Sequence, residues 1–564
     1  MRKLLQTAAA LLTVVAATSW AGPVRAADDP YNVLVFSRTA GFRHDSIAAG
    51  TQAIRDLGAA NGFSVTATED PAAFTAAGLA GYAAVVFLNT TGDVLDNNQQ
   101  TAFEGYIRGG GGYVGVHSAA DTEYDWPFYG DLVGAYFASH PAIQPATEVV
   151  EDRAHAATAH LPQRWNRTDE WYNYRTNPRS TAHVLASLDE GSYSGGGMGA
   201  DHPHVWCKTL DGGRSFYTGA GHTQESYADP AFRAHLLGGL RYAAGATNAD
   251  CRPETGYTTL YNGATTGWSQ AGPGAFTNAD ATLTSTGGLG LYWYSAKQFT
   301  NYSLKLDWKL AGDDNSGVFV GFPPSTDPWS AVNNGYEVQI DATDAADRTT
   351  GAVYSFQSAD LAARDAALNP PGEWNTYELL VEGERLRVFL NGTKINDFTN
   401  TDPVRSLAGH IGLQNHGDGD DASFRNVRIK ELGGTPPGGT GPIVGLANKC
   451  LDVAGAGTAD GTKIQLYTCN GTGAQTWTVT PNSTIKALGK CLDVAGGGTA
   501  NGTKAQLWTC NGTGAQNWSA QPDQTLRNPQ SGRCLDVSEH NPADGQQIHI
   551  WDCLGAANQK WTLP

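Results

Sequence analysis

The tetrapeptide Cys450-Leu-Asp-Val453 returns twice near the end of the chain, as Cys491-Leu-Asp-Val494 and as Cys534-Leu-Asp-Val537. Each copy is closed by a Gln-x-Trp motif, at residues 475–477, 516–518 and 559–561. Self-similarity at a period of about 40 residues predicts one supersecondary unit used three times around a shared core. Because each unit must bury a face against the others, we expect Trp477, Trp518 and Trp561 to be core residues.

Six of the eight cysteines lie in these repeats and form three pairs with the same spacing of 19 residues. The pairs are Cys450 with Cys469, Cys491 with Cys510, and Cys534 with Cys553. An even number of regularly spaced cysteines is typical of a disulfide framework in a secreted chain rather than of a metal site. Cys207 and Cys251 are then the only partners left for each other, which predicts a fourth disulfide.

The segment 443–564 resembles the ricin-B-type lectin family, which folds as a β-trefoil. The resemblance implies one sugar site per repeat, made of the opening Asp, a polar and an aromatic residue before the second Cys, and the closing Gln. The residues implied are Asp452, Gln465, Tyr467 and Gln475; Asp493, Gln506, Trp508 and Gln516; and Asp536, His549, Trp551 and Gln559. The family's Asn before the closing Gln is present only as Asn558. A carboxylate accepts two sugar hydroxyls and an aromatic face covers the C–H side of the ring. A trefoil with a purely structural role is the alternative.

The first residues have the features of a secretory signal peptide, over 1–26. Arg2-Lys3 precedes an apolar run that ends near Ala17, and small residues stand before Ala27. The run is shorter than the ~20 apolar residues of a spanning helix. We therefore predict a secreted, extracellular protein without a membrane span.

The composition argues for a neutral, hydroxylated partner. The formal net charge is −18 and becomes more negative once the basic signal peptide is removed. An acidic chain repels phosphate backbones, which excludes nucleic acid. A low charged fraction of 16% with 15 Trp and 22 Tyr favours a poly- or oligosaccharide.

The mature chain divides into three domains. A Gly-, Pro- and Thr-rich stretch at 433–442 is typical of a linker. A second boundary lies near Ala244 to Thr255, where a helical pattern ends and short alternating strands begin. The predicted domains are therefore 30–250, 256–432 and 443–564.

The first domain alternates apolar strands with helices. Apolar runs at 33–36, 83–88 and 113–116 are separated by helical segments, one opening at Asp45 or Ser46 and another at Asp96. This pattern predicts an α/β domain with a parallel sheet covered on both faces. In such sheets functional residues gather in the loops after the carboxyl ends of the strands.

Four motifs in 30–250 resemble the ThuA (trehalose utilisation) family: Thr39-Ala-Gly-Phe-Arg-His-Asp-Ser46, Gly111-Gly-Tyr-Val-Gly-Val-His-Ser-Ala-Ala-Asp121, Asp169-Glu-Trp-Tyr172 and Gly219-Ala-Gly-His-Thr223. The resemblance implies a flavodoxin-like fold shared with class I glutamine amidotransferases. Those enzymes carry a nucleophilic Cys in a turn after a strand, whereas Gly115-Val-His-Ser-Ala119 places His117 there. Thioester chemistry with a Cys nucleophile is therefore excluded.

Histidines concentrate in this domain, which holds ten of the fourteen. His44, His117 and His222 stand in the ThuA-like motifs, and with Glu170 they offer ligands for a divalent metal ion of open identity. Acid/base work on a sugar is the alternative use. His140 and His204 also follow strands. Other histidines are better explained by packing: His155, His160, His183 and His235.

The middle domain alternates apolar and polar residues with period two, which predicts a β-sandwich. Several motifs in 256–432 resemble the 3-keto-disaccharide hydrolase family, a laminarinase-like jelly roll. They include Asn315-Ser-Gly-Val-Phe-Val320, Gly335-Tyr-Glu-Val-Gln-Ile-Asp341, Gly372-Glu-Trp-Asn375 and Ile411-Gly-Leu-Gln-Asn-His-Gly417. Gly321 stands where the family commonly has an Arg.

The candidate catalytic set of the middle domain lies mostly on one strand. Glu337, Gln339 and Asp341 occupy alternate positions, so their side chains share a face. With His416 they could act as an acid/base pair or hold a metal. A solvated outer face is the alternative reading of this triplet.

Together these patterns favour a secreted glycoside hydrolase that is held on polysaccharide by its lectin domain. The resemblance of the middle domain suggests 3-keto-glycosides as one substrate class. The alternative is a non-catalytic, multivalent carbohydrate-binding protein.

Overall fold

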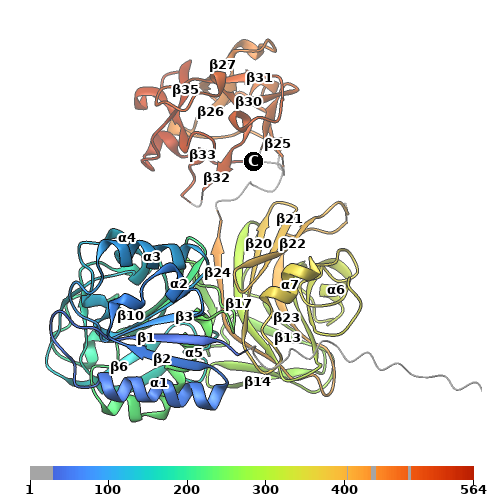
Figure 1. Cartoon of the computed structure of the whole chain (residues 1–564). Helices are drawn as coiled ribbons and strands as arrows, with labels where there is room; N and C mark the ends of the chain where they lie inside the picture. Colours follow the sequence, from blue (N-terminus) through green and yellow to red (C-terminus); the bar gives the residue numbers. More distant parts are fainter. Residues whose placement is uncertain (1–29, 403, 433–439, 481–483, 522) are drawn as a thin grey trace, which may run out of the picture.

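The computed structural model describes residues 30–402, 404–432, 440–480, 484–521 and 523–564. The predicted signal peptide and most of the predicted linker lie outside the described residues. Figure 1 shows three bodies in chain order: an α/β domain, a β-sandwich and a β-trefoil. The predicted multidomain fold class is therefore confirmed.

The α/β domain is built on a mixed sheet in the order β2-β1-β3-β4-β11-β10-β9-β6-β7. The five strands from β2 to β11 are parallel to their neighbours, and the remainder are antiparallel. The bounds are β1 Asn32–Phe36, β2 Ser64–Thr68, β3 Ala84–Leu88, β4 Gly112–Val116, β5 Phe137–Ser139, β6 Gln144–Val150, β7 Arg164–Asp169, β8 Asn173–Tyr174, β9 His183–Leu188, β10 Pro203–Leu210 and β11 Gly213–Thr218.

Helices cover both faces of this sheet, as the continuous apolar strands predict. Val33 and Val35 of β1 belong to the core on one face, with residues of α1 and α5. Leu34 and Phe36 belong to the core on the other face, with residues of α3 and α4. The helices are α1 Ile47–Asn61, α2 Ala76–Leu79, α3 Asn97–Arg108, α4 Pro127–Val133 and α5 Pro230–Ala243. Asp96 and Gln99 form a capping box that starts α3 where the sequence predicts it.

The sandwich packs two antiparallel sheets around one apolar core. One sheet has the order β14-β15-β24-β17-β20-β21-β22, with β12 also on β24, and the other β13-β16-β23-β18-β19. The bounds are β12 Thr258–Tyr261, β13 Trp268–Ala271, β14 Ala275–Ala279, β15 Thr282–Thr286, β16 Gly290–Tyr294, β17 Tyr302–Leu310, β18 Asn315–Phe322, α6 Ser330–Asn334, β19 Tyr336–Asp341, α7 Leu361–Ala367, β20 Asn375–Glu382, β21 Arg385–Leu390, β22 Thr393–Thr399, β23 His410–Asn415 and β24 Ala422–Glu431.

The polar face of β17 is buried, although alternation of this kind is typical of a strand with one face toward solvent. Lys305 lies 2.9 Å from Asp250 and 2.8 Å from Glu254, both in the segment that joins the first two domains. Glu254 also accepts from Arg428 at 2.6 Å. The Cys207–Cys251 disulfide ties this joining segment to β10. We define Asp250, Glu254, Lys305 and Arg428 as the interdomain charge cluster.

The trefoil repeats one hairpin three times, as β26–β27, β30–β31 and β34–β35. The three closing tryptophans are buried in its single core, as expected. Each donates its indole N–H to a backbone carbonyl of the opening motif, of Leu451, Leu492 or Leu535. The bounds are β25 Thr440–Gly441, β26 Cys450–Val453, β27 Thr462–Tyr467, β28 Trp477–Val479, β29 Ile485–Ala487, β30 Lys490–Val494, β31 Ala505–Trp508, β32 Ser519–Ala520, β33 Leu526–Asn528, β34 Arg533–Val537 and β35 Gln546–Trp551.

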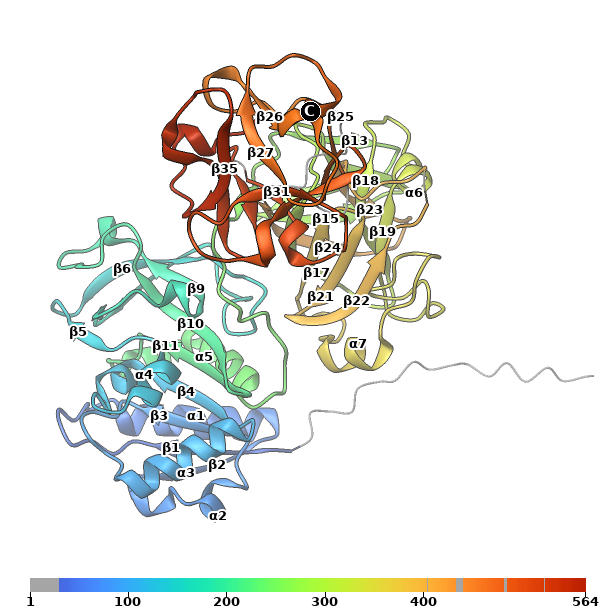
Figure 2. The ribbon, with the colours of Figure 1, turned by 90° about the horizontal axis from the view of Figure 1, so that it is seen from above.

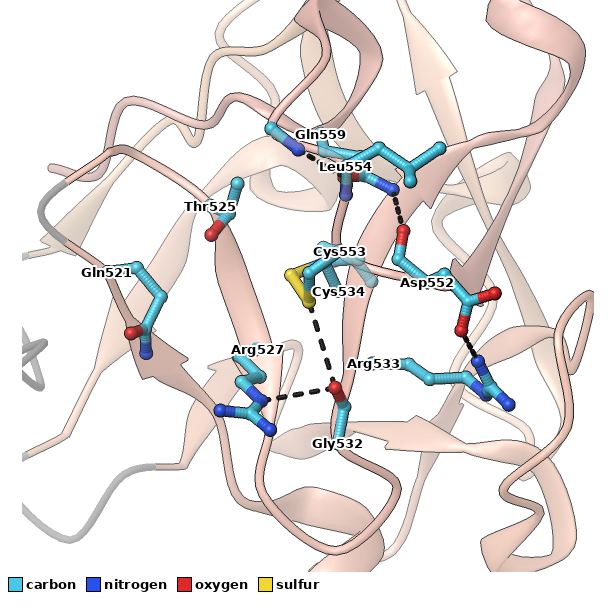
Figure 3. The surroundings of a disulfide bond; sticks show 12 residues. Gln521, Thr525, Arg527, Gly532, Arg533, Cys534, Asp552, Cys553, Leu554 and Gln559 are labelled. Atoms are coloured by element: carbon cyan, nitrogen blue, oxygen red, sulfur yellow. Dashed lines mark hydrogen bonds and ion pairs between the residues drawn. A yellow bond between two sulfur atoms is a disulfide. The ribbon is translucent and has the colours of Figure 1, made fainter. Parts of the chain in front are cut away.

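The three predicted repeat disulfides are present, Cys450–Cys469, Cys491–Cys510 and Cys534–Cys553. Figure 3 shows the third, with Asp552 paired to Arg533 and Gln559 donating to the Asp552 carbonyl. Among the described residues, no helix has the length and apolar character needed to cross a membrane.

Candidate functional site

The structure brings together the four residues that the sequence singles out as metal ligands. His44 follows β1, His117 follows β4 directly, Glu170 follows β7, and His222 follows β11. One ligand atom from each lies within 4.8 Å of the others. We call these four residues the histidine cluster. Three of them follow the carboxyl ends of β1, β4 and β11 in the parallel part of the sheet, where such sheets carry their sites.

The closest contacts in the histidine cluster join nitrogen and oxygen atoms that could share one ion. His117 Nε2 lies 3.1 Å from His222 Nδ1, and Glu170 Oε2 lies 3.1 Å from the same Nδ1. Glu170 Oε2 is also 3.4 Å from His117 Nε2. The His44 ring stands edge-on to the other two imidazoles at about 5 Å between centroids. Three imidazoles and one carboxylate form a donor set that suits zinc and related divalent metals.

His117 is held in a conformation that few residues adopt. Its φ is 50°, in the left-handed region, which costs a non-glycine residue about 1–3 kcal/mol and often marks a functional position. Its Nδ1–H donates to the Gly219 carbonyl at 2.8 Å, which leaves the Nε2 lone pair facing the cluster. The Tyr217 hydroxyl donates to the His117 carbonyl at 2.8 Å. These contacts orient the imidazole as metal sites require.

Asp169 positions two of the four ligands, a role that the sequence reasoning missed. Its Oδ1 accepts from the backbone N–H of Glu170 and of His222, both at 3.0 Å. Its Oδ2 accepts from Gly221 N–H at 2.9 Å and from Arg167 at 3.0 Å. Burial alone would raise the pKa of Asp169, but the Arg167 charge and these backbone donors lower it. The one indication in the sequence was that Asp169 precedes Glu170 in a ThuA-like motif.

The pKa values of three residues in the histidine cluster are shifted by burial and by their neighbours. Burial, with the neighbouring His117 and His222, lowers the pKa of His44 to about 3, so its imidazole is neutral. Burial opposes ionisation of Glu170, but the close contacts with His117 and His222 outweigh burial and hold the pKa of Glu170 well below its usual range. Burial would lower the pKa of His222, yet its hydrogen bond to Glu170 raises it. The cluster therefore offers the neutral imidazole of His44 together with the ionised carboxylate of Glu170.

Other histidines of the first domain have separate partners. His140 lies at the rim, 44% exposed, with Nδ1 2.9 Å from Glu170 Oε1. His204 pairs with buried Glu148 at 3.2 Å, and His183 pairs with Asp152 at 2.8 Å. His235 Nδ1–H donates to the Ala157 carbonyl at 2.8 Å. Of these, only His140 touches the histidine cluster.

The polar triplet of the middle domain is enclosed rather than solvated. Glu337, Gln339 and Asp341 share one face of β19 and are each less than 10% exposed. This face lies opposite the sandwich core and continues into a small apolar cluster that includes Trp293 and Phe319. The structure therefore does not support the alternative of a solvated face.

Glu337 is a buried carboxyl, and no cation pairs with it in the part of the chain that the structure describes. Gly317 leaves room for it, because a Cβ there would overlap the carboxyl group. Burial raises the pKa of Glu337 to about 8, with a smaller opposing effect of the hydrogen bond to Gln414. Within the described residues, Oε1 of Glu337, Oε1 of Gln339 and Oε1 of Gln414 have no hydrogen-bond partner. Gln414 was not predicted, although it stands in a motif of the family.

His416 lies outside this enclosed face. Its side chain is half exposed and its Nδ1 lies 2.9 Å from Asp420. Asp420 accepts from the backbone N–H of Asn315 at 3.1 Å, and the Asn315 amide donates to Asp341 at 2.8 Å. His416 is thus linked to the triplet through Asp420 and Asn315, and no direct contact joins these described residues.

The trefoil places each predicted sugar set around one carboxylate. In the first two repeats the carboxylate accepts from two amides, Asp452 from Gln465 and Gln475, and Asp493 from Gln506 and Gln516. In the third, Asp536 contacts His549 and accepts from Asn558 and Gln559. The aromatic partners Tyr467, Trp508 and Trp551 are 36–39% exposed, unlike the closing tryptophans. An exposed ring beside a held carboxylate is the arrangement that a sugar requires.

Three family models match consecutive parts of the chain. Residues 32–243 match ThuA, trehalose utilisation, and residues 256–430 match the 3-keto-alpha-glucoside-1,2-lyase-like domain. Residues 439–561 match the ricin-type beta-trefoil lectin domain. The three predicted resemblances are confirmed.

Solved structures resemble single domains of the chain. A ThuA-like protein from Bacteroides uniformis is 24% identical and covers 39% of this chain and 94% of its own, with a TM-score of 0.35. A candidate glycosyl hydrolase from Parabacteroides distasonis is 25% identical and covers 31% and 94%, with a TM-score of 0.28. A non-toxic homologue of type II RIPs from Momordica charantia, in complex with α-methyl-D-galactoside, is 30% identical and covers 22% and 48%, with a TM-score of 0.21.

No curated protein matches the chain as a whole or in part. The family matches of the middle and C-terminal domains nevertheless establish that the function of the protein is related to carbohydrate.

Proposed function

We propose that the protein is a secreted hydrolase of glycosides that carries a divalent metal ion in the histidine cluster and is held on polysaccharide by its trefoil. The observation that carries the proposal is the convergence of His44, His117, Glu170 and His222 from four separate segments. Glycosides that carry a 3-keto group are the first substrates to test, because of the family that the middle domain matches.

The residues of the cluster fit a divalent metal ion. A bound ion would polarise a sugar oxygen or lower the pKa of a water molecule. Neutral His44, oriented His117 and ionised Glu170 supply the lone pairs, and Asp169 fixes the loop that carries His222. His140 remains at the rim within reach of Glu170 and of solvent. A rim histidine is suited to move a proton to or from a sugar hydroxyl.

The trefoil explains how the enzyme would stay near its substrate. Three sites on one rigid domain raise apparent affinity for a repeating polymer, because each further contact is intramolecular. The sites share the carboxylate and aromatic pattern but differ in their donors, since among the described residues only Asp536 has a third partner. Retention on polysaccharide by this domain is therefore separable from turnover by the first two.

The experiment uses the full mature chain. The metal content of the purified protein is measured, and 3-keto-glycosides and unmodified glycosides are incubated with it before and after chelation. We expect turnover that chelator abolishes and added metal restores. His222→Ala and Glu170→Gln should lose metal and activity, whereas His160→Ala, at an exposed histidine of the same domain, should retain both.

Absence of turnover by the metal-loaded wild type, with polysaccharide binding retained, would contradict the enzyme proposal. That result would instead favour a non-catalytic, multivalent carbohydrate-binding protein.

A second candidate reaction centre is the enclosed face of the middle domain. The specific observation is Glu337, whose pKa of about 8 keeps it protonated at neutral pH, as a general acid must be. Loss of turnover in Glu337→Gln with full metal content would assign the chemistry to this domain. Loss in Glu170→Gln alone would assign it to the histidine cluster.

A further inference from the structure

An exposed aromatic side chain stands beside the histidine cluster. Phe42 is 67% exposed, more than any other aromatic side chain among the described residues. Its ring contacts the His44 ring edge-on, at 4.9 Å between centroids and an interplanar angle of 85°. Phe42 does not belong to either apolar core of the domain, and its exposed ring lies against His44.

The backbone that carries Phe42 is fixed to the neighbouring strand-end loop. The Thr91 hydroxyl donates to the Phe42 carbonyl at 2.8 Å, and Ala40 N–H donates to the Thr91 carbonyl at 2.7 Å. Arg43, the next residue, forms an ion pair with Glu69 at 2.6 Å. The backbone that carries the ring is therefore fixed before any ligand arrives, which reduces the entropic cost of binding.

The surroundings of Phe42 do not resemble a protein-docking surface. Docking surfaces are contiguous apolar patches, whereas Phe42 is a single ring flanked by the exposed Arg43–Glu69 pair. A small ligand with one apolar face and several polar edges fits better. An aromatic face beside fixed polar groups is the usual arrangement for a pyranose ring.

The same chain uses this arrangement three times in its trefoil. There an aromatic residue that is 36–39% exposed lies beside a buried Asp held by amide donors. In the first domain, Phe42 lies beside a buried group of imidazoles and the Glu170 carboxylate. The two types of site differ in what meets the sugar oxygens, which is a carboxylate in the trefoil and a cation centre in the first domain.

We propose that Phe42 and the histidine cluster together form a pyranoside-binding subsite. The C–H face of the ring lies on Phe42, and two neighbouring hydroxyl groups of the sugar point toward the cluster. This inference rests on the proposed function, because it takes the cluster to hold a metal ion. It adds the residue that binds the sugar ring and restricts the ligand to a neutral pyranoside.

The test uses Mn²⁺ as the metal and methyl α-D-glucopyranoside as the probe, with the full mature chain. Paramagnetic broadening of the sugar proton resonances falls steeply with distance, so it reports sugar beside the cluster and not sugar in the trefoil. We expect broadening in the Mn²⁺-loaded wild type and none in His222→Ala. Phe42→Ala should weaken the sugar affinity measured this way by about 3- to 10-fold, the range of an aromatic contact.

Matched variants distinguish the loss of sugar stacking on Phe42 from a general disturbance of the protein. Phe42→Trp keeps an aromatic face and should retain affinity for the sugar. Trp329→Ala removes another exposed aromatic side chain, in the middle domain, and should change nothing. Mn²⁺ affinity, measured by titration calorimetry, should stay within about two-fold of wild type in Phe42→Ala, because Phe42 donates no ligand atom.

Each outcome has a distinct meaning. Failure of the wild type to bind Mn²⁺ or any other divalent metal would overturn the proposed function and this inference with it. Metal binding without broadening of the sugar resonances would overturn the inference alone. Broadening that is unchanged in Phe42→Ala would also overturn the inference alone.

Discussion

His117 shows how one residue can carry both backbone strain and a candidate chemical role. Its motif, Gly115-Val-His-Ser-Ala119, predicts a strand-end turn, and the structure places the residue at φ 50° directly after β4. Hydrogen bonds at Nδ1 and at its carbonyl hold the imidazole in one orientation. A strained residue with such support is expected where geometry must be exact. The metal itself stays a prediction.

Asp169 provides a test of the cluster that leaves all four ligands in place. Asp169→Asn keeps the size of the side chain but turns one acceptor into a donor that faces Gly221 N–H. We expect metal affinity to fall by about 10- to 100-fold, as for other residues that orient ligands. Titration calorimetry with a divalent metal measures the effect. Asp96→Asn, at the cap of α3 in the same domain, should leave the affinity unchanged, and an equal loss in both variants would argue against a specific role.

Glu337 links burial to pH-dependent stability. Its pKa is about 8 in the folded protein against 4.5 for an exposed carboxyl, so between these values the unfolded chain releases a proton that the folded chain retains. This carboxyl therefore lowers the free energy of unfolding by about 1.4 kcal/mol per pH unit from about pH 4.5 to 8. Below pH 4.5 it has no such effect.

We expect Glu337→Gln to remove that pH dependence. The stability difference between variant and wild type should be small near pH 5 and should grow toward pH 8 in favour of the variant. Calorimetric unfolding at several pH values measures it. A constant difference over this range would show that Glu337 is already ionised in the folded protein.

At the scale of elements, the trefoil hairpins place their functional residues by register. Asp452 pairs directly with Gln465 across β26 and β27, and the other two hairpins repeat this with Asp493–Gln506 and Asp536–His549. Residues opposite one another in an antiparallel pair bring their side chains together on one face. The carboxylate and its partner therefore meet in every repeat without help from the rest of the molecule.

Two tryptophans of the second repeat should respond differently to substitution. Trp518 is 1% exposed, so Trp518→Ala should lower the free energy of unfolding by about 3–5 kcal/mol. Trp508 is 36% exposed, so Trp508→Ala should weaken polysaccharide binding with little change in stability. Thermal unfolding and a polysaccharide pull-down measure the two effects. Equal destabilisation by both variants would mean that Trp508 is a packing residue.

At the scale of the whole molecule, the first two domains share a buried polar interface. Figure 2 shows the sandwich and the α/β domain as neighbouring bodies, and the interdomain charge cluster lies where they join. Glu254 meets both Lys305 and Arg428 there, and the charge of Arg428 helps to hold its pKa well below the usual range against the effect of burial. The two domains are therefore expected to unfold as one unit.

Removing the Glu254 carboxylate should uncouple the unfolding of the α/β domain from that of the sandwich. Glu254→Ala leaves two buried cations without their shared carboxylate, and we expect a loss of about 3–5 kcal/mol. Differential scanning calorimetry should resolve separate transitions for the two domains in this variant. Glu431→Ala, which removes an exposed pair with Lys297, should cost only about 0–1 kcal/mol. A single unchanged transition in Glu254→Ala would show that other contacts couple the domains.

The sequence by itself determined what is encoded locally. The three repeats, their cysteine spacing and their buried tryptophans predict the trefoil and its disulfides, because each unit carries its own full pattern. Apolar runs between helices predict the covered parallel sheet for the same reason. The three family resemblances follow from motifs that are continuous along the chain, and the structure and the family matches confirm them.

Only the tertiary structure decided which side chains meet. His44, His117, Glu170 and His222 are more than fifty residues apart from one another in sequence, and the sheet order brings them together while it directs His204 and His183 elsewhere. Asp169 and Phe42 gain their proposed roles from that same arrangement. The polar faces of β17 and β19 have the alternation of solvated strands, yet a neighbouring domain covers the first and side chains of its own domain enclose the second. Period-two patterning records which residues share a face, and what covers that face is set by contacts between distant parts of the chain.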